Sequence, residues 1–197
     1  MKTFIMAFIA LLLISAGAQA QFQKGDWELG MTFAAGSYSQ SGQSESGDYD
    51  YDAKYLALAL LPGYYLLDGL SLEPEFNYYT MENSAPTFQL LGNLSYTRWL
   101  PGQRAAWFVR AGAGAGNGVP YPGTNLALFD TGESIFILNF GAGLKSPISR
   151  SVALRTELNY KLYRYTRSNL DNYGYSSGST DYDIRDFSIR IGFSILL

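Results

Sequence analysis

The chain has 197 residues and a formal net charge of −3, so it lacks the basic excess that would favour nucleic-acid binding. It contains neither cysteine nor histidine, which excludes disulfides, thiolate metal sites and catalysis that needs an imidazole base. Hydrophobic residues make up 47% of the chain, and its 16 tyrosines, 12 phenylalanines and 21 glycines are typical of a β protein.

The N-terminus has the pattern of a secretory signal peptide. Lys2 precedes the apolar run of residues 4–15, and Ala18 and Ala20 form a small-x-small cleavage signal. The run is shorter than the ~20 residues of a spanning helix, so an uncleaved anchor is the less favoured alternative. We therefore predict a signal peptide at residues 1–20 and a single mature domain at residues 21–197.

Eight segments of the mature chain alternate between apolar and polar residues, which is the period of a half-buried β-strand. In the third segment, for example, Leu72, Pro74 and Phe76 alternate with Glu73 and Glu75. The predicted strands cover residues 26–37, 52–67, 70–81, 87–100, 105–116, 134–146, 151–167 and 187–197.

The connections between these strands alternate between short and long. Short ones, with tight-turn residues, follow the second, fourth and sixth strands at residues 68–69, 101–104 and 147–150. Long ones, rich in Gly, Ser, Asp, Asn and Tyr, are expected at residues 38–51, 117–133 and 168–181, whereas residues 82–86 form a shorter link. Such alternation is typical of membrane barrels, which have short turns on one side of the membrane and long loops on the other.

The last predicted strand keeps its alternation to the final residue. Ser188, Arg190, Gly192 and Ser194 occupy one face. The other face carries six apolar residues: Phe187, Ile189, Ile191, Phe193, Ile195 and Leu197. Pairing of this strand with the first one would close the sheet and leave no exposed edge. We expect the six apolar side chains to face lipid.

Alternation alone fits two architectures, a soluble lipocalin-like barrel with an apolar interior and a membrane barrel with a polar interior. The polar faces carry few charges, of both signs, whereas a soluble exterior is usually richer in charge. They also carry many glycines, which suit a narrow interior, and aromatic residues gather near strand ends, as at a membrane interface. We predict an all-β, eight-stranded, antiparallel, up-and-down transmembrane β-barrel.

An eight-stranded barrel is just wide enough for its own side chains to fill it. Charged residues on the polar faces should then pair with one another inside the lumen. The predicted lumen network has these members: Glu28, Glu73, Glu75, Arg110, Arg155, Glu157, Lys161 and Arg190. Leu61, Phe108, Ile135 and Ile137 are apolar residues of the predicted lumen, and they give some support to a path for a small apolar solute.

The sequence motifs favour neither an enzyme nor a cofactor site. Glu73 and Glu75 share one strand face and could act as an acid–base pair, but membership of the lumen network explains them better. The glycine-rich residues 112–118 lack the Lys-Ser/Thr ending of a phosphate-binding loop, and the acidic residues 45–52 match no calcium loop. We therefore expect no catalytic residue, no metal and no cofactor.

Two stretches resemble the small outer-membrane β-barrel proteins of bacteria, akin to OmpA-type, OmpX-type and OmpW-type domains: LPGYYLLDGLSLEPEF (residues 61–76) and FGAGLKSPISRSVALRTELNYKLYRY (residues 140–165). The final strand resembles the C-terminal signal that the barrel assembly machinery reads in that family, although Leu197 stands where the family usually has Phe. The resemblance implies a Gram-negative outer membrane, with membrane lipid and the assembly machinery as partners and both termini in the periplasm.

The first functional expectation is a non-enzymatic barrel with a side-chain-filled lumen and a structural or surface-interaction role through extracellular loops. Its extracellular ligand or surface partner is not identified by the sequence. The alternative is an OmpW-like conduit or small pore for ions or small apolar solutes. A third hypothesis, a soluble lipocalin-like carrier, requires the inverse arrangement of faces.

Overall fold

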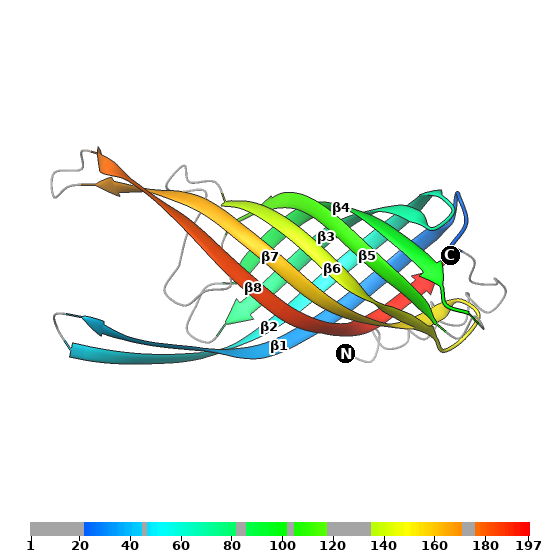
Figure 1. Ribbon diagram of the computed structural model, residues 1–197, viewed down its shortest axis with the longest axis horizontal. Coiled ribbons are helices and arrows are strands. Elements are labelled where there is room, and N and C mark those ends of the chain that lie inside the picture. Colours follow the sequence, from blue (N-terminus) through cyan, green and yellow to red (C-terminus); the bar gives the residue numbers. More distant parts are fainter. Residues whose placement is uncertain (1–21, 45–46, 82–85, 102–104, 118–134, 171–175) are drawn as a thin grey trace, which may run out of the picture.

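The computed structural model describes residues 22–44, 47–81, 86–101, 105–117, 135–170 and 176–197. These residues form eight β-strands that close into one barrel (Figure 1). The strands are β1 (Trp27–Ser44), β2 (Gly47–Leu67), β3 (Leu70–Met81), β4 (Thr87–Trp99), β5 (Ala106–Gly116), β6 (Ile135–Pro147), β7 (Val152–Leu170) and β8 (Ser176–Leu196). No helix among the described residues is long and apolar enough to cross a membrane.

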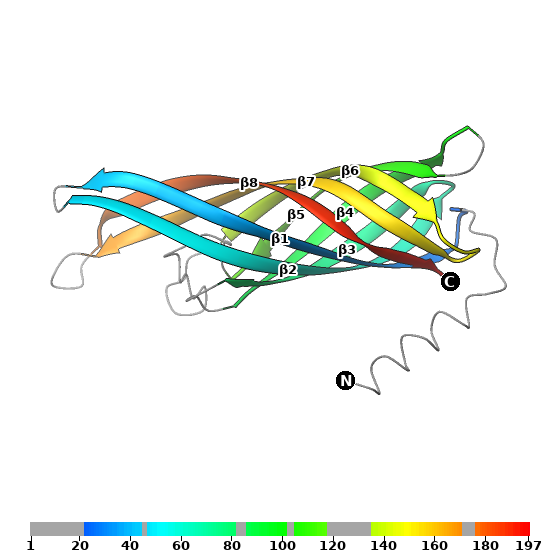
Figure 2. The ribbon, with the colours of Figure 1, turned by 90° about the horizontal axis from the view of Figure 1, so that it is seen from below.

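Each strand pairs antiparallel with the next, and β8 pairs with β1 to close the barrel. β2 joins β3, and β6 joins β7, through short connections at one end, which we call the turn end; the chain also finishes there (Figures 1 and 2). β1 and β2, and likewise β7 and β8, form hairpins that point to the opposite end, the hairpin end. The predicted fold class, an eight-stranded antiparallel up-and-down barrel, is therefore confirmed.

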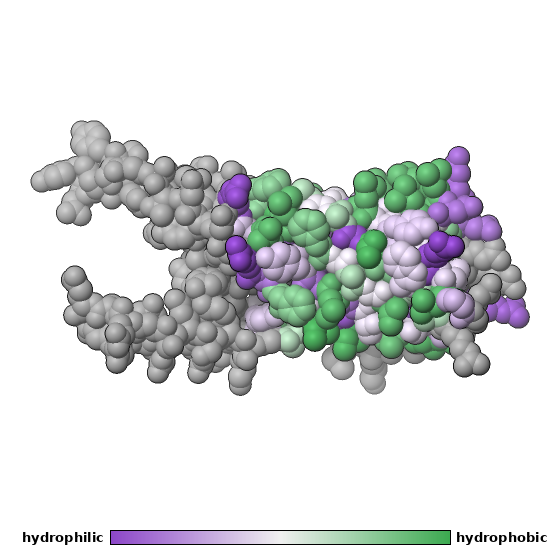
Figure 3. All heavy atoms as spheres, viewed as in Figure 1, coloured by the Kyte–Doolittle hydropathy of each residue, from purple (hydrophilic) through white to green (hydrophobic). Residues whose placement is uncertain are grey.

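Side chains along the barrel wall point alternately outwards and inwards. The outward side chains form an apolar outer band, part of which Figure 3 shows over the barrel body. Phe33 on β1, Phe76 on β3, Leu94 on β4 and Phe140 on β6 are exposed members of this band. Most inward side chains are polar or small, and they are buried. This arrangement is that of a membrane barrel and is the inverse of the soluble-carrier hypothesis.

The last strand lies with its predicted apolar face on the outside. Five of the six predicted lipid-facing residues are exposed there: Phe187, Ile189, Ile191, Phe193 and Leu197. Ile195 differs from the prediction, because only 4% of its surface is exposed. Its cross-strand partners are Leu29 on β1 and Val152 on β7, and Val152 and the adjacent Leu196 are buried with it at the turn end.

Two hairpins are longer than predicted. β1 stays paired with β2, and β7 with β8, far beyond the other strands (Figure 1). The loops predicted at residues 38–51 and 168–181 are therefore wrong, because most of these residues are strand. A two-stranded ribbon beyond the barrel has no core to cover, so its sequence lacks the apolar period that revealed the other strands. The links predicted at residues 82–86 and 117–133 lie almost entirely outside the described residues.

The pairing of β1 with β8, here called the seam, is much shorter than the hairpins. It consists of six residue pairs, from Glu28–Leu196 to Phe33–Ile191. By comparison, β1 and β2 form 18 residue pairs, and β7 and β8 form 19. Towards the hairpin end, no further pair joins β1 to β8 within the described residues, and the two strands diverge (Figure 1).

The segment before β1 folds over the turn end of the lumen. Phe22 packs against Tyr65, Ala106 and Leu196 in a buried apolar cluster. The Gly69 N–H donates a hydrogen bond of 2.7 Å to the Phe22 carbonyl, which fixes the segment to the β2–β3 turn. Residues 1–21, with the predicted signal peptide, lie outside the described residues, so the division of the chain at residue 20 remains a prediction.

Candidate functional site

All eight residues of the predicted lumen network lie on the inner face of the barrel, and each is 3% exposed or less. The strand period brings them there, because residues at alternate positions share a face. Glu73 and Glu75 are inner residues of β3, and Arg155, Glu157 and Lys161 are inner residues of β7. The lumen is therefore the candidate site.

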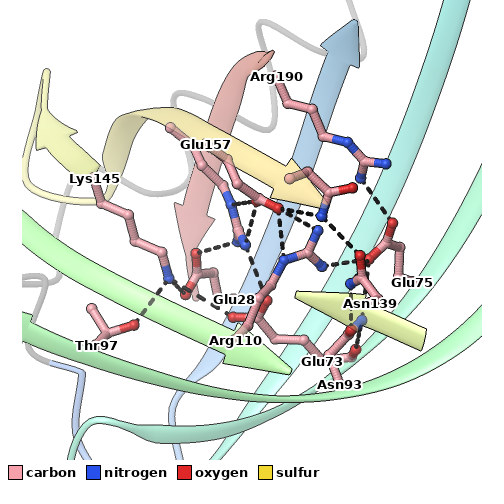
Figure 4. Close-up of polar contacts among 12 residues, drawn as sticks. Glu28, Glu73, Glu75, Asn93, Thr97, Arg110, Asn139, Lys145, Glu157 and Arg190 are labelled. Atoms are coloured by element: carbon pink, nitrogen blue, oxygen red, sulfur yellow. Dashed lines mark hydrogen bonds and ion pairs between the residues drawn. The ribbon is translucent and has the colours of Figure 1, made fainter. Parts of the chain in front are cut away.

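Arg110 on β5 forms the centre of the network (Figure 4). Its Nε and Nη2 donate hydrogen bonds of 2.8 Å and 2.5 Å to Glu157 Oε1, and its Nη1 donates to Glu75 Oε2. Glu75 Oε1 accepts a 2.8 Å hydrogen bond from Arg190 Nη1 and lies 3.2 Å from Lys161 Nζ. One carboxylate thus binds three cations, which come from β5, β7 and β8.

Two further cations bind the carboxylates nearer the turn end. Lys145 Nζ donates a 2.7 Å hydrogen bond to Glu28 Oε2, and Arg155 Nη2 donates 3.2 Å bonds to Glu73 Oε2 and Glu157 Oε2. Lys145 is absent from the predicted network. The alternation of β6 does place Lys145 on the inner face, so the sequence pattern was sufficient to include it in the predicted network.

Three asparagines link the charged groups across the lumen. Asn159 Nδ2 donates to Asn139 Oδ1 at 2.8 Å, and Asn139 Nδ2 donates to Asn93 Oδ1 at 2.7 Å. Asn93 and Asn139 also donate to Glu75 Oε2, at 3.1 Å and 3.2 Å. The sequence indicated only that they share the polar faces; because an amide both donates and accepts, they complete the network.

Gly141 on β6 makes room for the centre of the network. A Cβ atom at this position would lie 2.6 Å from Glu157 Oε1 and 2.9 Å from Arg110 Nε. Both distances are shorter than van der Waals contact allows. A side chain here would therefore displace the Arg110–Glu157 pair.

Tyrosine and glutamine extend the network towards the hairpin end. Lys161 Nζ donates to Tyr79 Oη at 3.2 Å and to Gln89 Oε1 at 3.0 Å, while Arg190 Nη2 donates to Tyr79 Oη at 3.2 Å. The four apolar residues predicted for the lumen are buried as well: Leu61, Phe108, Ile135 and Ile137. Polar and apolar side chains are thus both buried on the inner face.

Several buried polar atoms on the lumen wall formed by β1 and β8 lack a hydrogen-bond partner among the described protein atoms. Thr32 Oγ1 and Ser194 Oγ are two of these atoms. Glu28 Oε1 has no hydrogen-bond partner either, although it forms a 3.8 Å ion pair with Arg155 Nη1 of β7. Gly30, the cross-strand partner of Ser194, adds no side chain to this wall. Buried polar atoms of this kind usually bind water. The wall therefore has the chemistry of a hydrated strip.

The arrangement suits structural charge pairing better than catalysis. Each carboxylate of the network, on Glu28, Glu73, Glu75 and Glu157, is bound by at least one cation. Across the ranges that the structure describes, no group of three or more His, Cys, Asp or Glu residues could hold a metal ion.

The chain matches the family described as "Outer membrane protein beta-barrel domain" over residues 6–194. No curated protein matches it in sequence. The crystal structure of Neisserial surface protein A is 12% identical with a TM-score of 0.53, and the match covers 87% of this chain and 97% of that one.

Two other solved outer-membrane proteins share the fold. OprG from Pseudomonas aeruginosa is 15% identical with a TM-score of 0.53, covering 91% of this chain and 99% of that one. AlkL, studied in DMPC bilayers, is 16% identical with a TM-score of 0.51, covering 90% and 92%. Because the family match spans nearly the whole sequence, the chain belongs to the outer-membrane β-barrel protein family.

Proposed function

We propose that this protein is a non-enzymatic integral outer-membrane barrel, closed by its own side chains, that acts through its projecting hairpins. The observation that carries the proposal is the ion-pair network around Arg110, whose members come from β1, β3, β5, β6, β7 and β8. A solute could cross only by separating buried ion pairs. Breaking one such pair costs about 3–5 kcal/mol.

The two long hairpins supply the surface for the proposed interaction. They project beyond the outer band at the hairpin end (Figures 1 and 2). The sequence of residues 38–51 and 168–181 is rich in Tyr, Ser, Gly and Asp. Tyr, Ser and Gly suit adaptable contacts in binding loops. The partner in this proposal is an extracellular ligand or surface.

The same proposal orients the barrel in the membrane. Short connections of such barrels usually face the periplasm and long ones the outside. By this rule we propose that the turn end and both termini lie in the periplasm and that the hairpin end lies outside. The outer band then contacts lipid, and β8 is the segment that the barrel assembly machinery would read.

Single-channel recording tests the closed lumen. Protein purified from the outer membrane, with folding verified by heat-dependent gel migration, should show no discrete openings in a planar bilayer. The double variant Arg110→Ala/Glu157→Ala removes both partners of the central pair and should conduct, which makes it the positive control. Steady openings of the unmodified protein would contradict the closed lumen.

Shortening the hairpins tests the surface role. Replacing residues 38–51 and 168–181 with tight turns should leave gel migration and outer-membrane level unchanged, because the barrel body lies outside these segments. Cells that display the shortened barrel should bind immobilised proteins and polysaccharides less than cells that display the full one. Equal binding would rule out the hairpins as the contact surface.

A narrow path for water or small ions is the second candidate. Thr32 Oγ1 on β1 and Ser194 Oγ on β8, which are buried without a hydrogen-bond partner among the described protein atoms, favour it. Proteoliposomes should then swell faster in an osmotic step than liposomes without protein, and Thr32→Leu should remove the difference. Equal swelling of the three preparations would exclude this path.

A further inference from the structure

The end of the seam leaves part of β8 uncovered. Beyond the Phe33–Ile191 pair, β8 has no β1 neighbour among the described residues. Phe187 and Ile189 are 63% and 62% exposed, more than any other apolar side chain described on the eight strands. Together with Ile191 they form an apolar line on the outer face, here called the β8 strip.

Two arginines end the outer band directly above this strip. Towards the hairpin end, the next outer-face residue after Phe187 on β8 is Arg185, and the next one after Leu162 on β7 is Arg164. Both arginines are exposed. The cross-strand partner of Arg185 is Leu162 and that of Arg164 is Asp183, so the two arginines are diagonal neighbours. Such neighbours lie about 7–8 Å apart, within reach of two long side chains that bind one group. Figure 3 shows hydrophilic side chains where the outer band meets the hairpins.

We propose that Arg164, Arg185 and the β8 strip form a binding site for a membrane lipid with a phosphate headgroup. Guanidinium groups donate paired, charge-assisted hydrogen bonds to phosphate oxygens, and their geometry suits phosphate better than that of lysine. An acyl chain below the phosphate lies along Phe187, Ile189 and Ile191, where the departure of β1 exposes apolar surface.

The position of the arginines identifies a lipid as the occupant rather than a soluble phosphate. They stand at the edge of the outer band, at the depth where lipid headgroups meet water, and the apolar strip continues from them into the band. The site depends on the barrel spanning the membrane and does not depend on the role of the hairpins.

Arg98 on β4 provides a matched control. It is also exposed on the outer face, but it lies near the turn end and its cross-strand partner is Trp107.

The test uses Arg164→Gln/Arg185→Gln and Arg98→Gln, purified as folded barrels in detergent. Each protein is mixed with equal amounts of phosphatidic acid and phosphatidylcholine that have the same acyl chains. Native mass spectrometry then gives the ratio of the two lipids bound.

The unmodified protein and Arg98→Gln should prefer phosphatidic acid, and the double variant should bind the two lipids nearly equally. A basic residue near an anionic lipid contributes about fivefold, so the preference should fall by roughly tenfold or more. Equal binding by the unmodified protein, or the same loss in Arg98→Gln, would overturn the proposal. So would displacement of phosphatidic acid by an equal concentration of inorganic phosphate, because the site would then bind free phosphate.

Discussion

The centre of the lumen and the seam between β1 and β8 are held together by different means. In the centre, Arg110 joins Glu75 and Glu157, so side chains from distant strands bind across the barrel. At the seam, six backbone-paired positions join the first and last strands, and beyond them the strands part. The comparison indicates that side chains stabilise the cross-section over its full width, whereas the wall closes over only part of its height.

Removing the central cation should have the largest effect. Arg110→Ala takes the cation from two buried carboxylate oxygens, Glu157 Oε1 and Glu75 Oε2. The other oxygen of Glu157 keeps Arg155, and that of Glu75 keeps Arg190 and Lys161. We expect a loss of about 3–5 kcal/mol in the free energy of unfolding.

Denaturant titration of the folded barrel in lipid vesicles, followed by tryptophan fluorescence, measures this loss. Arg98→Ala, on the outer face, should stay within about 0.5 kcal/mol of the unmodified protein. If Arg110→Ala has the same free energy of unfolding as the unmodified protein, the central network does not stabilise the barrel.

A charge at the seam should have the next largest effect. Ile191 is exposed on the outer face at the last β1–β8 pair, so Ile191→Arg places a cation in the outer band. The cost should be about 2–4 kcal/mol if this pair lies near the middle of the membrane. Phe187→Arg, closer to the hairpin end, should cost about 0–1 kcal/mol. Equal costs for the two variants in the same vesicle titration would show that the seam ends away from the membrane interior.

Crowding the centre of the lumen should cost less than removing its cation. Gly141→Ala forces a methyl group against Glu157 Oε1 and Arg110 Nε, and small overpacking of this kind costs about 1–3 kcal/mol. Gly92→Ala on β4 is the matched control, because a Cβ atom there meets nothing within 4 Å. A smaller effect at Gly141 than at Gly92 would contradict the tight packing of the centre.

Paired cysteines measure where the seam ends, with the smallest effect on stability. The chain has no native cysteine, so introduced pairs report without interference. Phe33→Cys/Ile191→Cys joins a cross-strand pair and should oxidise readily, whereas Ala35→Cys/Ile189→Cys lies beyond the last pair and should oxidise more slowly. Gel migration without reductant distinguishes the two. Equal rates would mean that β1 and β8 remain paired beyond Phe33.

The sequence predicted the strands that have a regular apolar–polar alternation and that border a tight turn. β3 has the predicted bounds, Leu70–Met81, because its alternation is regular and the Asp68–Gly69 turn precedes it, with Gly69 at a φ of +77°. The same period placed the lumen charges on the inner face. It could not show that the ribbon ends of β1, β2, β7 and β8 are strand, because those ends have no apolar face.

The alternation of apolar and polar residues also could not predict contacts between distant parts of the chain. Phe22 precedes the first strand and follows no period, yet it packs against Leu196 from the other end of the chain. The chain of amide bonds from Asn159 through Asn139 to Asn93 depends on the side-by-side order of β4 to β7 and on rotamers, neither of which alternation specifies.

The short seam has a consequence for the order in which the barrel assembles. Glu28 and Leu196 stand near opposite ends of the chain, so the seam pairs are the least local of the strand pairings among the described residues. The entropic cost of bringing these strands together must be met before their hydrogen bonds can form. The two long hairpins consist of neighbours in the chain and can pair early. Closure of the seam therefore comes last, and it forms fewer backbone hydrogen bonds than any other strand pairing that the structure describes. The seam is then the step that limits both the folding and the unfolding of the barrel.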